Sequence, residues 1–150
     1  MENYDSDMEK RVWKRVRGET GQTPPQYPSV RALLLAELEQ GALLLQLSRQ
    51  LQGGGKEIAR RIYKENQTQG NILRGICFCM TGKRPLLKVA PASLLNPENA
   101  LRKCYTFSLR AVREYENRTA DPEYGATFAA LAKEERAHCA LLLELLGSLP

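Results

Sequence analysis

The residues best suited to chemistry in this chain are Glu135 and His138, a Glu-x-x-His pair within a periodic C-terminal segment. Residues three apart lie on one face of a helix, so this spacing brings a carboxylate and an imidazole to the same point. The other residues of that helical stripe are apolar: Phe128, Leu131, Leu142 and Leu145. The pattern predicts that the pair faces the interior. Because buried polar groups need partners, a bound metal ion is one interpretation.

Four further polar residues fall on the expected inner stripes of the other helices: Glu39, Asn66, Gln69 and Ser108. A single shift along the sequence superposes the polar positions in pairs: Glu39 on Ser108, Asn66 on Glu135, and Gln69 on His138. The same shift places Lys64-Glu65 on Lys133-Glu134. The chain therefore contains a faint internal repeat whose interior polar positions fall in register.

Four long helices must position these residues. Their expected ranges are 29–52, 56–81, 96–118 and 121–147, with Ser29 as an N-cap and Gly53-Gly54-Gly55 as a stop. Asn96-Pro97-Glu98 and Asp121-Pro122-Glu123 are start signals of the third and fourth helices. The first and last connections are short, whereas residues 83–95 form a long one. We therefore expect two domains: an N-terminal arm over 1–28, with a short amphipathic helix at 6–17, and a helical bundle over 29–150.

With these residues and this connectivity, the chain resembles the ferritin-like superfamily, and within it the rubrerythrin-type bundles. The resemblance implies an all-α fold, an antiparallel four-helix bundle with a long crossover between its second and third helices. It also implies a two-metal site with one Glu from each of two helices and a Glu-x-x-His from each of the other two. Carried over, Glu39, Glu135 and His138 match ligands. The remaining ligand positions are degenerate, being occupied by Asn66, Gln69 and Ser108.

Half of the implied ligand set is therefore missing. Two glutamates supply too little charge and too few oxygens for a full di-iron centre. We expect at most one weakly bound Fe, Mn or Zn ion on Glu39, Glu135 and His138, with Gln69 or water completing the shell. The alternative is a metal-free polar core, which we favour over a di-iron centre.

Two classes of function follow. The first is a residual rubrerythrin-like oxidoreductase activity, meaning peroxide reduction or iron oxidation. The second is a non-catalytic helical bundle that acts through protein–protein interaction. A segment apolar around much of its circumference, 32–47, favours a homodimer that uses this helix and the N-terminal arm. We expect Trp13 to pack the arm onto the body or onto a neighbouring subunit.

The composition is consistent with a helical protein and restricts its partners. Of 150 residues, 43% are hydrophobic, 26% charged and 7% aromatic, and no apolar run is long enough to span a membrane. The N-terminus has no signal-peptide pattern, and four cysteines lack C-x-x-C spacing, so we expect a cytoplasmic protein with reduced thiols. A net charge of +5 raises nucleic acid as a partner. Basic and acidic residues are interleaved and no binding motif is present, so we expect none.

Overall fold

The computed structural model describes residues 6–17 and 23–150, and this part of the chain forms five α-helices without β-strands. The helices are α1 (Ser6–Val16), α2 (Tyr27–Gln50), α3 (Gly53–Thr81), α4 (Pro97–Glu116) and α5 (Gly125–Ser148). The all-α class is confirmed, as is the short helix of the N-terminal arm. The rest of that arm includes residues 1–5 and 18–22, which lie outside the described residues.

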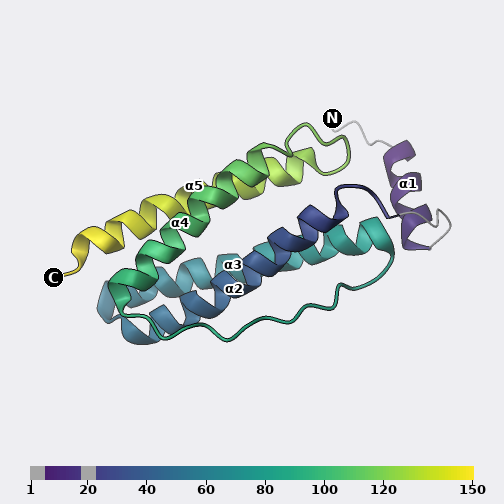
Figure 1. The fold of residues 1–150 in the computed structure, drawn as a ribbon. Helices are drawn as coiled ribbons and strands as arrows, with labels where there is room; N and C mark the ends of the chain where they lie inside the picture. Colours follow the sequence, from purple (N-terminus) through teal and green to yellow (C-terminus); the bar gives the residue numbers. More distant parts are fainter. Residues whose placement is uncertain (1–5, 18–22) are drawn as a thin grey trace.

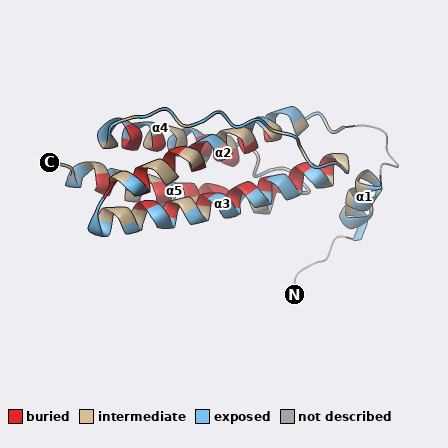
Figure 2. Ribbon diagram, turned by 90° about the horizontal axis from the view of Figure 1, so that it is seen from below, coloured by how far each residue is buried: buried red, intermediate tan, exposed pale blue. Residues whose placement is uncertain are grey.

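The four long helices associate in two pairs (Figure 1). α2 packs along α3, and α4 packs along α5; contacts of α2 with α4 and of α3 with α5 join the pairs. Residues 84–96 have no regular secondary structure and run along the helices from the end of α3 to the start of α4 (Figure 1). The buried faces of the long helices turn toward one another (Figure 2).

α1 lies at one end of the long helices, against α3 (Figure 1). Arg15 attaches it: Nε donates to the Cys79 carbonyl (3.2 Å), Nη1 to Glu123 Oε1 (3.2 Å) and Nη2 to the Tyr124 hydroxyl (3.3 Å). Trp13 is half exposed and donates weakly to Glu9 of its own helix (3.4 Å). Trp13 therefore does not pack the arm onto the body, and the guanidinium of Arg15 takes that role. Packing of Trp13 onto a neighbouring subunit stays a prediction.

Two helix starts differ from the sequence prediction. α2 begins at Tyr27, before the expected N-cap, because Pro28 lies in the first turn, where a missing N–H costs nothing. Ser29 instead donates its hydroxyl to the Gln26 carbonyl (2.9 Å). α5 begins only at Gly125, since the Asp121 carboxylate accepts from the backbone N–H groups of Glu123 and Tyr124 (2.8 Å each) and holds a separate turn.

The other two starts follow different rules. α4 begins as expected, with Asn96 Oδ1 accepting from the Asn99 N–H (2.9 Å). The three glycines expected to end a helix instead form the first turn of α3, whose first residue, Gly53, has a φ of 57°. The left-handed region suits glycine, so the sharp turn from α2 is made by one residue and the helix continues directly.

The hydrophobic core is divided into two clusters along the helices. One contains the start of α2, the end of α3 and the start of α5, with Leu34, Met80 and Phe128; the other contains the opposite ends, with Leu47, Ile62 and Leu142. With the exception of Ser48, which lies beside Leu47 of the second cluster, the buried polar residues that the structure describes on the long helices lie between the two clusters. These residues are Glu37, Gln40, Asn66, Gln69, Ser108, Glu135 and His138.

Burial repeats between the two helix pairs. The shift that places Gln69 on His138 brings six buried positions of α3 onto six of α5: Ala59 on Phe128, Ile62 on Leu131, Asn66 on Glu135, Gln69 on His138, Leu73 on Leu142 and Ile76 on Leu145. For α2 and α4 the buried positions coincide under a slightly larger shift: Val30 on Leu101, Leu33 on Cys104, Glu37 on Ser108, Gln40 on Ala111 and Leu44 on Tyr115. The two helix pairs thus repeat a burial pattern under two different shifts, and Glu37, not Glu39, is the counterpart of Ser108.

The apolar circumference of α2 has an explanation within the chain. Residues 90–93 form one wall of a groove of about 420 Å³ whose other wall includes Ala36 and Leu43 of α2. Arg31 donates to the Leu86 carbonyl and Gln50 to the Leu95 carbonyl, at 2.8 Å each, so the long connection is fastened to α2. Because the connection lies over this side of α2, its apolar residues do not require a second subunit. The homodimer stays a prediction.

Candidate metal centre

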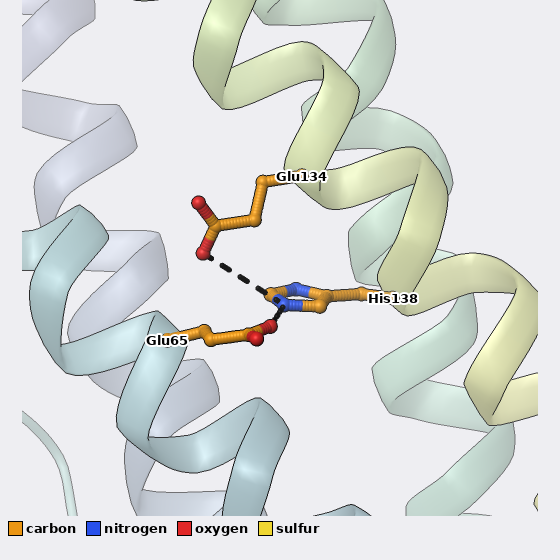
Figure 3. A group of neighbouring side chains, drawn as sticks. All are labelled: Glu65, Glu134 and His138. Carbon is orange, nitrogen blue, oxygen red and sulfur yellow. Dashed lines mark hydrogen bonds and ion pairs between the residues drawn. The ribbon is translucent and has the colours of Figure 1, made fainter.

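His138 lies at the contact between α5 and α3, and the carboxylates of Glu65 and Glu134 face one edge of its imidazole (Figure 3). Its side chain is 2% exposed. Nε2 lies 2.7 Å from Glu65 Oε2 of α3 and 4.0 Å from Glu134 Oε1 of its own helix. On the other side of the ring, Nδ1 lies 3.6 Å from Glu135 Oε2. The chain's single histidine thus has an acidic partner at both nitrogens.

Glu65, Glu134 and His138 form the group of described residues that could hold one metal ion. Ligand atoms from these three residues all lie within 4.8 Å of one another. The two glutamate side chains are about a third exposed, at 32% and 34%, whereas the imidazole is buried. The group therefore opens to solvent on its carboxylate side. One imidazole nitrogen with carboxylate oxygens is a donor set for iron(II), manganese or zinc.

The charges around His138 favour its protonated form. Burial would lower the pKa of His138, but the carboxylates of Glu135 and then Glu65 outweigh burial and raise it. For Glu65, His138 and Arg61 outweigh the opposing effect of burial, so its pKa is lowered. Burial raises the pKa of Glu134. The imidazole does not offset this effect, because it lies farther from Glu134 than from Glu65. Without a metal, the raised pKa of His138 favours a protonated imidazole shared between these carboxylates.

Glu37 lies deeper, at the inner polar position of α2, and both of its carboxyl oxygens are occupied. The Tyr115 hydroxyl donates to Oε1 (2.5 Å), and Asn66 Nδ2 donates to Oε2 (2.6 Å) and to the Glu37 carbonyl (3.1 Å). Burial, and then the negative charge of Glu135, raise the pKa of Glu37 well above its usual value. Glu37 therefore keeps its proton to a higher pH than an ordinary glutamate, and its oxygens already have partners.

Gln69 is the least satisfied polar residue of the interior. It is fully buried, and among the described residues neither its amide oxygen nor its amide nitrogen has a hydrogen-bond partner. Glu135 Oε2 likewise has no hydrogen-bond partner there. Gln69 follows Glu65 by one turn of α3, just as His138 follows Glu134 by one turn of α5. Its amide oxygen is thus the buried acceptor still available on the α3 side.

The predicted interior positions are confirmed as buried for five of the six residues. Asn66, Gln69, Ser108, Glu135 and His138 are all buried. Glu39 is the exception: it is exposed and lines the groove beneath residues 90–93.

The prediction that Glu39 faces the interior is therefore wrong, and Glu37 holds that position. Two residues correspond to about 200° around a helix, so the two glutamates point in nearly opposite directions. α2 is apolar on both sides, since one side packs on helices and the other meets the long connection. The hydrophobic pattern of this segment therefore does not distinguish the two stripes.

Glu65 and Glu134 are absent from the residues that the sequence predicts for the site. In sequence, Glu65 belongs to a run of charges typical of a solvated face. The signal that could have found both is the repeated Lys-Glu dipeptide, Lys64-Glu65 and Lys133-Glu134, which flanks the interior positions in each half. The structure brings these two equivalent glutamates to the same imidazole.

No protein-family model matches this chain, and no curated protein or solved structure matches it significantly. Among the described residues, no helix is both long enough and apolar enough to cross a membrane. The residues around His138 and their geometry are what supports a functional proposal.

Proposed function

We propose that this chain is a ferritin-like bundle protein that binds a single divalent metal ion at Glu65, Glu134 and His138. The observation that carries the proposal is the position of the only histidine. Its Nε2 atom lies 2.7 Å from one carboxylate and 4.0 Å from a second, while a third carboxylate, Glu135, lies at Nδ1. A carboxylate behind a metal-binding imidazole fixes the tautomer and orients the ring.

The fold part of the proposal rests on connectivity and on the repeat. A two-residue link joins α2 to α3, which favours antiparallel neighbours, and the long connection 84–96 corresponds to a crossover. The polar residues lie mid-way along all four helices, where ferritin-like proteins hold metals. The two helix pairs also share one burial pattern.

One ion, and not two, fits the residues present. Asn66 and Ser108 are neutral, and Glu37 has both oxygens engaged by Asn66 and Tyr115. The inner half of a two-metal site is thereby filled with hydrogen bonds. The proposed ligands lie one residue outward on each helix, at Glu65 and Glu134, and the unpartnered amide oxygen of Gln69 is suited to be the fourth.

The metal determines whether any redox activity remains. Bound iron would supply peroxide reduction or iron(II) oxidation, the chemistry that the family resemblance implies. Zinc or manganese at the same residues would give a binding protein without that activity.

A non-catalytic, metal-free bundle that acts through protein contacts is the second candidate. The specific observation in its favour is that Glu37, Asn66 and Tyr115 satisfy one another without an ion. In that case the ion pair of His138 with Glu65 is purely structural.

Calorimetric titration of resin-treated protein with Zn(II), Mn(II) or anaerobic Fe(II) tests the proposal. We expect one ion per chain, and we expect Glu65→Gln or Glu134→Gln to weaken binding by about tenfold or more. Both side chains are partly exposed, so these variants should fold. Glu144→Gln is the matched control, because it removes the same charge from an exposed position of α5.

Absence of binding at millimolar metal would favour the metal-free bundle. An equal loss in Glu144→Gln would mean that general surface charge, and not this group, attracts the ion. Two ions per chain would contradict the single-ion proposal and point back to a two-metal site.

A further inference from the structure

A second candidate site lies on the outer side of the α2–α3 pair. A groove of about 770 Å³ is bounded by the last turns of α2 and the first half of α3. Five basic side chains line it: Arg49, Lys56, Arg60, Arg61 and Lys64. Its volume falls within the range of about 300–1,000 Å³ that is usual for small-molecule sites.

The groove holds a disproportionate share of the charge of this chain. Its five cations and two carboxylates, Glu57 and Glu65, give +3, whereas the whole chain has a net charge of +5. Arg60 pairs with Glu57 (3.6 Å) and Arg61 with Glu65 (3.2 Å). No described residue pairs with the remaining three cations. The groove therefore presents unneutralised positive charge.

The spacing of these cations lowers the stability of α3. Lys56, Arg60 and Lys64 follow one another at four-residue intervals, so they share one face of α3. Like charges at this spacing repel one another and destabilise a helix. A bound anion removes that repulsion.

Core packing does not require this basic strip. In the repeat-equivalent register of α5, which places Gln69 on His138, six buried positions coincide. Three of the four basic groove residues of α3 are nevertheless replaced there: Gly125 for Lys56, Ala129 for Arg60 and Ala130 for Arg61. Only Lys133 corresponds to a groove cation, Lys64. The strip is thus a feature of one half of the repeat and not of the fold.

We propose that this groove binds a small molecule carrying two or more linked phosphates. Lys56, Arg60 and Lys64 span about 12 Å along α3, which suits an extended anion better than a single phosphate. Lysine and arginine both bind phosphate oxygens, arginine in a bidentate manner. The half-buried ring of Tyr63 lies on the wall of the same groove and offers an aromatic face to a nucleoside. Glu65 belongs both to this groove and to the proposed metal group, so phosphate binding is tested on metal-free protein.

The test is calorimetric titration of the full, resin-treated chain with inorganic triphosphate and, separately, with ATP, at about 50 mM salt. We expect Lys64→Gln to weaken triphosphate binding by about tenfold. Lys133→Gln is the matched control: it removes the same charge from the equivalent position of α5, outside the groove, and should change affinity by less than about twofold.

The two probes also distinguish the source of the phosphates. Equal affinity for triphosphate and ATP would mean that the phosphate chain alone is recognised. Tighter binding of ATP, lost in Tyr63→Leu, would add a nucleoside. No binding of either probe at millimolar concentration, or equal effects of Lys64→Gln and Lys133→Gln, would overturn the proposal.

Discussion

The Nε2 atom of His138 lies 2.7 Å from Oε2 of Glu65, across the contact between α5 and α3. The two residues come from different halves of the internal repeat, and the repeat-equivalent glutamate, Glu134, approaches the same nitrogen to 4.0 Å. In the absence of metal, the raised pKa of His138 favours an ion pair between Glu65 and a protonated imidazole. A metal ion would replace the proton and use the same three side chains.

Metal should therefore stabilise the protein against unfolding. At a free metal concentration of 100 times Kd, we expect the free energy of unfolding to rise by about 2.7 kcal/mol, because the ion binds only the folded chain. Urea denaturation with and without Zn(II) measures this. His138→Gln should lose the increase, whereas Glu144→Gln should keep it. The same increase in His138→Gln would contradict the assignment.

The contribution of Glu37 to the stability of the metal-free protein should fall as the pH rises above 4.5. The pKa of Glu37 is raised in the folded state, so the folded chain binds more protons than the unfolded chain in the interval between the two pKa values. The loss begins near the unfolded value of 4.5 and continues through the folded value.

Glu37→Gln should remove that part of the pH dependence, because an amide does not titrate. Urea unfolding at a series of pH values compares it with the wild type and with Glu39→Gln, which removes an exposed carboxylate from the same helix. Identical pH profiles for the wild type and Glu37→Gln would show that Glu37 does not titrate abnormally.

Gly41 should be intolerant of a side chain, and Gly75 should accept one. A Cβ at Gly41 would lie 2.6 Å from Asn66 Oδ1, and Asn66 cannot swing away without losing its bonds to Glu37. We expect Gly41→Ala to lower the free energy of unfolding by about 1–3 kcal/mol.

At Gly75 no heavy atom lies within 4 Å of the added carbon. Gly75→Ala should therefore raise stability by about 0.5–1 kcal/mol, since alanine has less unfolded-state entropy to lose. Chemical denaturation measures both variants. Equal effects of the two substitutions would mean that Asn66 is not held as described.

Loss of Arg15 should release α1. Its guanidinium contacts α3 and the turn before α5, and its side chain is only 14% exposed. Arg15→Gln leaves the partly buried Glu123 carboxylate with Arg11 alone (3.4 Å), so the opening free energy of α1 should fall by about 1–3 kcal/mol. Hydrogen exchange of the α1 amides reports this, with the exposed Lys14→Gln as control. Unchanged exchange in Arg15→Gln would indicate another attachment.

Much of the fold could be predicted from local signals. The Asn96 cap and Pro97 start of α4, Gly82 after α3 and the amphipathic α1 all depend on residues close in sequence, and they are present as expected. The misplaced starts of α2 and α5 are also local. Pro28 is compatible with a position before a helix or within its first turn, and Asp121 can cap a helix or hold a separate turn. The conformation of the preceding residues decides between the two.

The site is predictable only where one face of a helix is unambiguous. α3 has a single apolar stripe, and in α5 the pair Glu135 and His138 lies on the stripe of Leu131 and Leu142, so Asn66, Gln69, Glu135 and His138 could be placed inside. α2 has two such stripes, and its pattern favours Glu39 in place of Glu37. The side chain of Glu65 is a third exposed. In the sequence it resembles an ordinary surface charge, because its partner, His138, is 73 residues away.

The sequence by itself determined that five segments are helical, that two helix pairs share a polar interior, and that a Glu-x-x-His faces inward. Spacing along one helix is enough for that, since side-chain direction follows from the helical period. Only the tertiary structure decided which carboxylates meet the imidazole. That choice depends on the rotation and register of α3 against α5. Both arise from packing between the helices and do not appear as a periodic pattern in the sequence of either helix.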